Sequence, residues 1–222
     1  MILHVPGAPR EPVLFAFYAD CHGVFDHVER GRDRAGAVFL LGDQTPVGQT
    51  LEEALCPDAV ARTHWIFGNH DADQPEYLSA HDSMADRNLH GRVVTVHGVR
   101  VAGLGGTFRG KVWMPGQGPP RARTREEFLG RIGRHLRGKL PDRHRATIFP
   151  EDVKALANQR ANVLICHEAP ESHPFGFREI GDLARAMGVA AVLHGHHHRP
   201  ARRVEIEGGI MGVRRIRFSG HG

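Results

Sequence analysis

The most constraining feature of this sequence is a set of five short apolar runs, each of which ends in Asp, Asn or His. The runs read "VLFAFYADCH", "GAVFLLGD", "THWIFGNHD", "ANVLICHE" and "VAAVLHGHHH". Continuous apolar runs of this length predict strands that are buried on both faces of a parallel-type sheet. Because ligands bind outside the carboxyl ends of such strands, the polar residues after the runs are expected to share one site. The sequence therefore predicts an α/β fold with a functional site at its strand ends.

The segments between these runs predict helices and hairpins. Helical patterns occupy 24–34 and 50–61, and "GFREIGDLARAMG" predicts an amphipathic helix that ends at Gly188. Two alternating runs around "HG" at 97–98 predict a β-hairpin, and the tail at 202–218 predicts a second hairpin. The sequence contains no internal repeat, so we expect one domain over residues 1–222.

Residues 107–160 interrupt the alternation of strands and helices. The stretch "RGKVWMPGQGPPRAR" is rich in Gly and Pro, and Thr124 with Glu127 predicts a capping box ahead of a helix. The apolar face of that helix is formed by Leu129, Ile132, Leu136 and Leu140. Its opposite face is basic and carries Arg131 and Arg134. We interpret 107–160 as an inserted helical segment within the single domain and as a candidate cap over the site.

Composition limits the class of protein. A chain of 222 residues suffices for one α/β domain with a sizeable core. No stretch approaches the roughly 18 apolar residues of a membrane span, and the N-terminus lacks the pattern of a signal peptide. We therefore expect a cytoplasmic protein with no membrane partner. The formal charge of +4 and the pI of about 9.3 suit an anionic substrate without requiring nucleic acid.

The polar residues after the five runs are typical of metal ligands. They comprise two carboxylates, four imidazoles and one amide, namely Asp20, His22, Asp43, Asn69, His167, His196 and His198. Such nitrogen and oxygen donors suit Mn, Fe or Zn better than Ca, and the three scattered cysteines argue against a structural zinc site. Seven ligands exceed the needs of one ion but fit two ions that share an Asp.

Taken in order, the motifs "DCH…GD…GNHD…H…GHHH" resemble those of the calcineurin-like metallophosphoesterase superfamily, and they span residues 20–198. The resemblance implies a four-layer αββα sandwich with two metal ions as cofactors. By matching motif position it assigns the first ion to Asp20, His22 and His198 and the second to Asn69, His167 and His196, with Asp43 bridging the two.

The same resemblance implies a chemistry. A hydroxide that bridges the ions would attack a phosphate ester, and His70 would protonate the leaving oxygen as general acid. Asp71 or a backbone carbonyl is the candidate to orient the ring of His70. Asn69, His70 and Arg109 are the expected contacts of the substrate phosphate. The motif "GDQTPVG" lacks the Asp-Arg pair of the protein Ser/Thr phosphatases, so the resemblance is closer to the phosphodiesterase-type branches.

Strand alternation makes predictions about the neighbours of the ligands. His196 and His198 are one residue apart and are expected on the same side of an extended chain, with His197 on the other side. By the same reasoning Cys21 and Cys166, each next to a predicted ligand, are expected to face away from the metals as core thiols. His194 is expected to pack or to support a ligand.

Two other classes of function stay open. The basic segment 121–145 would serve a nuclease that processes nucleic acid. A non-catalytic scaffold of the same fold is the second alternative, which the complete ligand set and His70 disfavour. The match of "GGTFRGK" to a phosphate-binding P-loop is coincidental, because Val112 stands where Ser or Thr is required. The physiological substrate, the metal identity and the oligomeric state are not predicted.

Overall fold

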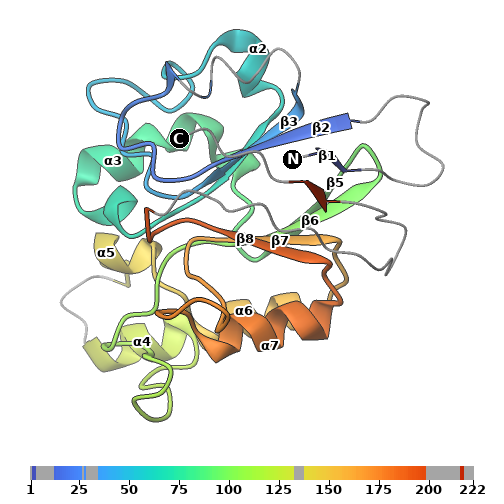
Figure 1. The fold of residues 1–222 in the computed structure, drawn as a ribbon. Coiled ribbons are helices and arrows are strands. Elements are labelled where there is room, and N and C mark those ends of the chain that lie inside the picture. The colour runs from blue at the N-terminus through green and yellow to red at the C-terminus, as the bar shows by residue number, and fades with distance from the viewer. Residues whose placement is uncertain are drawn as a thin grey trace.

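The computed structural model describes residues 2–3, 13–26, 28, 35–132, 138–198 and 216–217. Within this part of the chain, two β-sheets stack face to face, and helices cover the outer face of each sheet (Figure 1). This is the four-layer αββα arrangement that the resemblance implied, so the predicted fold class is confirmed. The helix predicted over 24–34 and the hairpin predicted over 202–218 lie mostly outside the described residues.

The first sheet has the strand order β4-β3-β2-β1-β9. Its members are β1 (Ile2–Leu3), β2 (Val13–Tyr18), β3 (Ala35–Leu41), β4 (Thr63–Ile66) and β9 (Ile216–Arg217). Strands β2, β3 and β4 are parallel, whereas β1 runs antiparallel to both β2 and β9. The carboxyl ends of the three parallel strands therefore meet at one end of the sheet.

The second sheet has the strand order β5-β6-β7-β8. Its members are β5 (Arg92–Val96), β6 (Val99–Leu104), β7 (Val163–Cys166) and β8 (Ala191–His194). Strands β6, β7 and β8 are parallel, and β5 pairs antiparallel with β6 as the predicted hairpin. The hairpin turn consists of His97 and Gly98, both with positive φ (48° and 78°), as a two-residue turn of this kind requires.

Strand β3 illustrates how sequence alternation makes the layers. Ala37, Phe39 and Leu41 face the space between the sheets, where they pack on residues of β6, β7 and β8. Val38 and Leu40 face the opposite way and pack with Trp65 beneath the outer helices. Successive side chains of a strand point to opposite faces, so a continuous apolar run supplies two separate cores at once.

Helices form the two outer layers of the sandwich. Helix α2 (Pro57–Val60), helix α3 (Pro75–Ala80) and the 3-10 segment η2 (Asp82–Arg87) cover the first sheet, and α6 (Pro150–Ala157) and α7 (Arg178–Met187) cover the second (Figure 1). The prediction of one helix over 50–61 was wrong. Cys56 is extended (φ −69°, ψ 153°), because a residue that precedes proline is disfavoured in the α conformation. No helix in the described ranges is long and apolar enough to cross a bilayer.

Helix α7 matches its prediction closely. It buries Ile180, Leu183 and Met187 against the second sheet and ends at Gly188, whose φ of 68° is the left-handed conformation that glycine adopts readily. An apolar stripe at helical spacing and a C-terminal glycine were sufficient to predict this element.

The segment 107–160 contains α4 (Arg125–Ile132), α5 (Asp142–Arg145) and α6. The Thr124 hydroxyl accepts the Glu127 N–H (3.0 Å), but the Glu127 carboxylate returns to the N–H of Arg123 (2.7 Å), so only half of the predicted capping box forms. Phe128 is the buried residue of α4, and Ile132 and Leu140 pack beside it. Leu129 is not in this cluster, and Arg134 and Leu136 lie outside the described residues. Because α6 packs against α7, the end of this segment is part of the outer layer of the sandwich.

One ion cluster ties α4 to α6. The Arg125 guanidinium donates to Glu151 (2.8 Å) and to both oxygens of Asp152 (2.6 and 3.0 Å), and it lies 4.7 Å above the ring of Phe149. Burial raises the pKa of Asp152, but hydrogen bonds and charges from His90 and Arg125 lower it by more, to about 2. The folded protein therefore holds this carboxylate ionised far below its usual range.

We expect this cluster to contribute stability that depends on pH. The pKa of Asp152 is depressed on folding, so its contribution is complete above the ordinary pKa of about 4 and is lost as the pH falls through about 2. Asp152→Asn should lower the free energy of unfolding by about 2 kcal/mol at pH 7. Urea unfolding of both proteins at pH 7 and pH 3 measures this, with Glu52→Gln as an exposed control. A stability difference that is equal at both pH values would contradict the assignment.

Candidate metal centre

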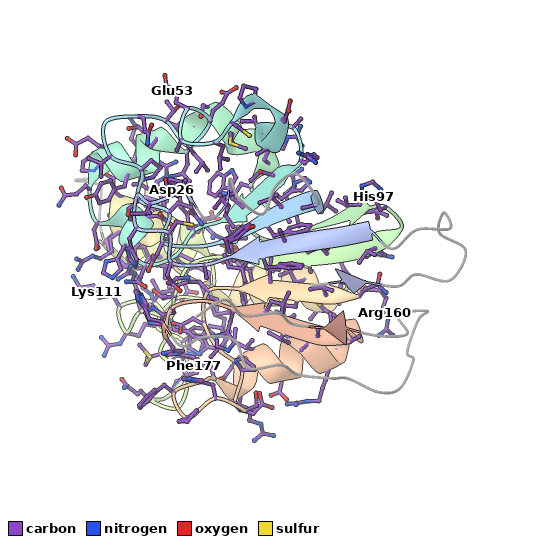
Figure 2. The ribbon with its side chains drawn as sticks, turned by 45° about the horizontal axis from the view of Figure 1, so that its top comes forward. Asp26, Glu53, His97, Lys111, Arg160 and Phe177 are labelled. Carbon is purple, nitrogen blue, oxygen red and sulfur yellow. The ribbon has the colours of Figure 1, made fainter. Side chains whose placement is uncertain are left out.

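The predicted ligands lie where the parallel strands of both sheets end. Figure 2 shows Asp26 and Lys111, which follow β2 and β6, at the end toward which these strands point, and His97 and Arg160 at the opposite end. Backbone pairing continues past the strands, since the N–H of Asp20 donates to Gly42 (3.0 Å) and the N–H of His22 donates to Asp43 (2.9 Å). The loops after β2 and β3 are therefore fixed to each other, with their polar side chains on one surface.

Five of the seven predicted ligands have a backbone conformation that is unusual for residues other than glycine. Their φ angles are positive, at 55° for Asp20, 44° for His22, 54° for Asp43, 72° for His196 and 46° for His198. Each such residue costs roughly 1 kcal/mol or more, and such costs concentrate at functional sites. The fold is therefore less stable than it would be with ordinary backbone angles at these residues, and their side chains point toward the site as a result.

The expectation that strand alternation places His196 and His198 on one side was wrong. Strand β8 ends at His194, and both ligands follow it in left-handed backbone rather than in an extended chain. The N–H of His196 donates to both carboxylate oxygens of Asp20 (3.1 Å each), which fixes the loop from the opposite sheet. The two rings reach the same region of the site by this loop geometry and not by strand alternation.

The first ligand cluster consists of Asp20, His22 and His198, whose ligand atoms lie within 4.8 Å of one another. The Nε2 atoms of the two histidines are 3.3 Å apart, and Nε2 of His198 is 3.7 Å from Oδ1 of Asp20. Both imidazoles are exposed. Two imidazole nitrogens and a carboxylate oxygen that face one another at this spacing are a suitable donor set for one divalent ion.

The second cluster consists of Asp43, His167 and His196, and its ligand atoms likewise lie within 4.8 Å of one another. Nδ1 of His167 donates to the carbonyl oxygen of Leu41 (2.8 Å), so in the neutral ring Nε2 carries the lone pair. That Nε2 lies 3.2 Å from Oδ2 of Asp43 and 3.1 Å from Oδ1 of Asn69. Asn69 therefore joins this cluster, as the resemblance implied.

Asp43 provides the test of whether metal ions fit these residues. Its side chain is 1% exposed, Oδ1 accepts the N–H of His70 (2.8 Å), and Oδ2 accepts no hydrogen bond of good geometry from any described residue. Burial raises the pKa of Asp43, but His167 and His70 lower it by more, so the carboxylate stays ionised. A buried, charged and unsatisfied oxygen is costly unless a cation binds it. The donor atoms present thus fit a metal pair.

The glycines of the motifs permit the close approach of these loops. Gly42 has a φ of 97°, and a Cβ at this position would lie 2.7 Å from the backbone of Gly68 and would collide with the ring of His167. A Cβ at Gly195 would lie 2.8 Å from Cβ of Ala19. Any side chain at these positions would separate the strand ends that carry the ligands.

The structure corrects the predicted role of Asp71. Its carboxylate is fully buried and accepts the N–H groups of Asp43 (2.8 Å), Thr45 (2.9 Å) and Gly68 (2.7 Å). It therefore joins the loops after β3 and β4. The carboxylate against the ring of His70 belongs to Asp73, with Nδ1 to Oδ2 at 2.6 Å. Because the 3-10 segment η1 (His70–Ala72) places residues i and i+3 on one side, Asp73 and not Asp71 meets this ring.

Arg109 lies beside the second cluster, where the sequence placed a candidate substrate contact. Its guanidinium donates to the backbone oxygen of Asn69 (3.3 Å), while Nε is buried with no hydrogen bond to any described residue. Burial, followed by the charge of Arg143, lowers the pKa of Arg109, which still remains a cation at neutral pH. Asp43 and Glu168 are near enough to affect it electrostatically.

The remaining histidines and cysteines near the site pack against other side chains and are not in the ligand clusters. The ring of His197 stacks on His173 at 4.2 Å, and His194 lies 5.6 Å from His173. Cys21 packs in the core beneath the outer helices, and burial raises the pKa of its thiol to about 12. Cys166 is buried in β7, and burial raises its pKa as well. Both thiols are therefore protonated at neutral pH.

Sequence reasoning missed two carboxylates near the site. Asp73 was not predicted, because its contact with the ring of His70 depends on the 3-10 conformation of the segment "HDAD". Glu168 directly follows His167, is 4% exposed and accepts the N–H of Phe108 (3.0 Å), and burial raises its pKa to about 7. Only the packing reveals that this glutamate is buried, since Glu is usually exposed.

A sandwich of two sheets with paired clusters of Asp, Asn and His at its strand ends defines a metal-dependent hydrolase scaffold. Comparison with known proteins agrees with this. A family model described as calcineurin-like phosphoesterase matches residues 13–200. The chain is also 43% identical over 197 residues to a protein of Haemophilus influenzae (strain ATCC 51907 / DSM 11121 / KW20 / Rd) that is described as uncharacterized, with 83% of each chain covered.

The chain belongs to the calcineurin-like phosphoesterase family and is a metal-dependent hydrolase of phosphate esters. Members of this family generally use two divalent metal ions, in agreement with the two clusters of possible ligands found here.

Proposed function

We propose that this protein is a phosphodiesterase whose metal pair is held by the two ligand clusters. The observation that carries the proposal is the convergence of Asp20, His22 and His198 with Asp43, His167 and His196, from four separate loops. Asn69 completes the second set through its 3.1 Å approach to His167. Asp43 is the proposed bridge, because its Oδ2 is buried without a hydrogen bond to any described residue, while Oδ1 accepts the N–H of His70. Mn, Fe and Zn all suit this donor set.

When bound, a metal pair supplies Lewis-acid stabilisation of the attacking and leaving oxygens and lowers the pKa of an attacking water. The residues of the chain supply the remaining steps. His70, half exposed, protonates the leaving oxygen through Nε2 as the bond from phosphorus to that oxygen breaks. Asp73 accepts a hydrogen bond from Nδ1 of the same ring, so it orients His70 with Nε2 toward the leaving oxygen. Arg109 offers N–H groups to a phosphate oxygen beside Asn69.

The preference for diesters follows from the cations that the site contains. A phosphate monoester carries an additional negative charge and therefore needs additional cations near the metals. The loop after Asp43 continues with Gln44 and Thr45, which are buried and uncharged. Among the described residues, the cation Arg109 contacts the second cluster through the backbone oxygen of Asn69. One arginine suits the single negative charge of a diester.

A nuclease function that depends on the basic segment 121–145 has less support. Three of its arginines have carboxylate partners: Arg125 pairs with Glu151 and Asp152, Arg131 pairs with Glu127 at 2.8 Å, and Arg145 lies 3.7 Å from Asp82. Their charge is partly neutralised within the fold. A track for a polyanion requires unpaired cations along one surface, so a small or medium-sized diester is the better proposal.

A panel of phosphate esters tests the proposal. The metal-loaded protein should hydrolyse bis(4-nitrophenyl) phosphate with a kcat/KM at least about tenfold above that for 4-nitrophenyl phosphate, because one missing ionic partner costs about 1.4 kcal/mol or more. The ratio is measured at equal substrate concentration and pH 7.5. A higher kcat/KM for the monoester would contradict the diester preference while leaving the phosphoesterase activity intact.

A further inference from the structure

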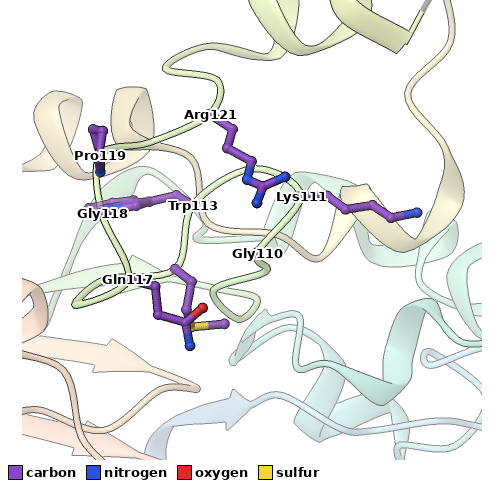
Figure 3. Close-up of a pocket in the computed structure, with 8 residues that line it drawn as sticks. Gly110, Lys111, Trp113, Gln117, Gly118, Pro119 and Arg121 are labelled. Atoms are coloured by element: carbon purple, nitrogen blue, oxygen red, sulfur yellow. The ribbon is translucent and has the colours of Figure 1, made fainter.

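A cavity lies in the loop between β6 and α4, and none of its lining residues belongs to the metal clusters. It has a volume of about 400 Å³, and Lys111, Trp113, Met114, Gln117 and Arg121 are among the residues that line it (Figure 3). Ligand pockets typically occupy about 300–1,000 Å³, so this cavity is large enough for a nucleotide-sized group.

The loop that forms the cavity is held in place by its own backbone. The carbonyl oxygen of Arg109 accepts the N–H groups of Val112 and Trp113 (2.8 Å each), which makes a tight turn. The carbonyl oxygen of Val112 in turn accepts the N–H groups of Arg121 (2.8 Å) and Ala122 (3.2 Å), which closes the loop. Val112 and Ala122 are both fully buried in a cluster with Phe128 and Phe149. The cavity is therefore preformed, which reduces the entropic cost of binding.

Two cations at the cavity have no carboxylate partner. Among the described residues, no Asp or Glu lies within ion-pair distance of Lys111 or Arg121, and neither side chain makes a hydrogen bond, whereas several other arginines are paired. The lining contains no acidic residue. This unneutralised charge favours an anionic ligand.

Trp113 supplies the apolar part of the same cavity. Its indole packs edge-on against Phe108 at 5.0 Å, so the ring is fixed, and Met114 lies beside it in the lining. Figure 3 shows Arg121 extending across the loop, while the side chains of Lys111 and Trp113 extend in opposite directions and the Lys111 ammonium points away from the Arg121 guanidinium. A ligand that uses both ends has an aromatic group at one end and an anionic group at the other.

Arg109 connects the loop that forms the cavity with the second ligand cluster. The guanidinium of Arg109 reaches the backbone of Asn69, and the tight turn at 109–113 places Lys111 two residues away and Trp113 against Arg109 itself. Two residues span at most about 7 Å between Cα atoms. The loop that lines the cavity therefore begins next to a residue that contacts the backbone of Asn69.

We propose that this cavity is a substrate subsite for a nucleotide, with the base stacked on Trp113 and a second phosphate bound by Lys111 and Arg121. The proposal rests on the proposed phosphodiesterase function and narrows its substrate class to phosphodiesters in which one ester group is a nucleotide with a further phosphate.

Fluorescence titration tests the subsite without hydrolysis. The chain has two tryptophans, and Trp65 is 2% exposed in the core, so a ligand in the cavity changes the emission of Trp113. ADP should change the emission of the metal-loaded protein, and Trp113→Phe should abolish the change. Lys111→Gln with Arg121→Gln should raise the Kd for ADP at least about tenfold but leave that for adenosine within twofold. Lys154→Gln, which removes an exposed charge on α6, is the matched control.

A kinetic comparison separates the subsite from the proposed function. Thymidine 3′-phosphate 5′-(4-nitrophenyl phosphate) and bis(4-nitrophenyl) phosphate release the same leaving group, but only the first carries a nucleotide with a second phosphate. The double variant should raise KM for the nucleotide ester about tenfold with kcat unchanged, and it should not alter KM for the other ester.

The outcomes distinguish the two claims. Equal changes for both esters, or an unchanged Kd for ADP in the double variant, would overturn the subsite while the phosphodiesterase function stands. If the wild-type protein hydrolyses neither ester, the proposed function fails, and the ADP titration still decides whether the cavity binds nucleotides. Binding of adenosine as tight as that of ADP would overturn the role of the cations.

Discussion

Asp43→Asn should lower the hydrolysis of phosphodiesters by at least about 10³-fold and should reduce the metal content of both clusters. The carboxylate is buried, ionised and in contact with His167, and its Oδ2 has no hydrogen bond to any described residue. An amide in its place offers a weaker, uncharged ligand. Lewis-acid stabilisation of the transition state is worth several kcal/mol, and each 1.36 kcal/mol is a factor of ten in rate.

Elemental analysis and kinetics on the same preparation measure this result. Asp26→Asn is the matched control, because Asp26 is an exposed carboxylate in the segment after β2 and is not in either ligand cluster. Asp20→Asn should differ from Asp43→Asn by weakening chiefly the cluster with His22 and His198. Undiminished metal in Asp43→Asn would contradict the bridging role, whatever the effect on rate.

His70→Ala should retain both metals and lose about 10²- to 10⁴-fold in turnover of diesters with poor leaving groups. The imidazole is 51% exposed and lies beside the first cluster, with its ring 5.6 Å from that of His22, so it can reach a leaving oxygen. A 4-nitrophenolate leaving group needs little protonation and should be affected much less. The slope of log kcat against leaving-group pKa should therefore become steeper in the variant.

Asp73→Asn should reproduce this pattern at smaller size, about tenfold for poor leaving groups, because it acts only by positioning His70. A purely structural role of Asp73 would lower all rates equally and would leave the slope unchanged. Loss of metal from His70→Ala would make this histidine a ligand, contrary to the role proposed here.

The four layers were implied by the family resemblance, whereas the buried strands and the candidate ligands that follow them were predicted from local pattern. Alternation along β3 encodes two cores, and the helix at 178–187 carries its stripe and its terminal glycine in one segment. The ligands follow strands directly, so knowing where a strand ends is enough to place Asp20 and Asp43.

What the sequence did not predict depends on backbone geometry and on contacts between distant segments. Left-handed backbone at His196 and His198 replaces the expected extended chain, and the 3-10 turn after Asn69 brings Asp73 rather than Asp71 to the ring of His70. The cavity beside Trp113 forms because Val112 pairs with Arg121 and Ala122 across a loop rich in Gly and Pro. No local periodicity signals such a closure.

We propose that the protein hydrolyses phosphodiesters with the help of two metal ions held by these clusters. This proposal is tested most directly by stripping the protein with a chelator and titrating one metal, such as Mn²⁺, back while measuring hydrolysis of bis(4-nitrophenyl) phosphate. We expect the stripped protein to be inactive and the activity to rise until two ions are bound per chain. Full activity in the presence of the chelator, or saturation at one ion per chain, would contradict it.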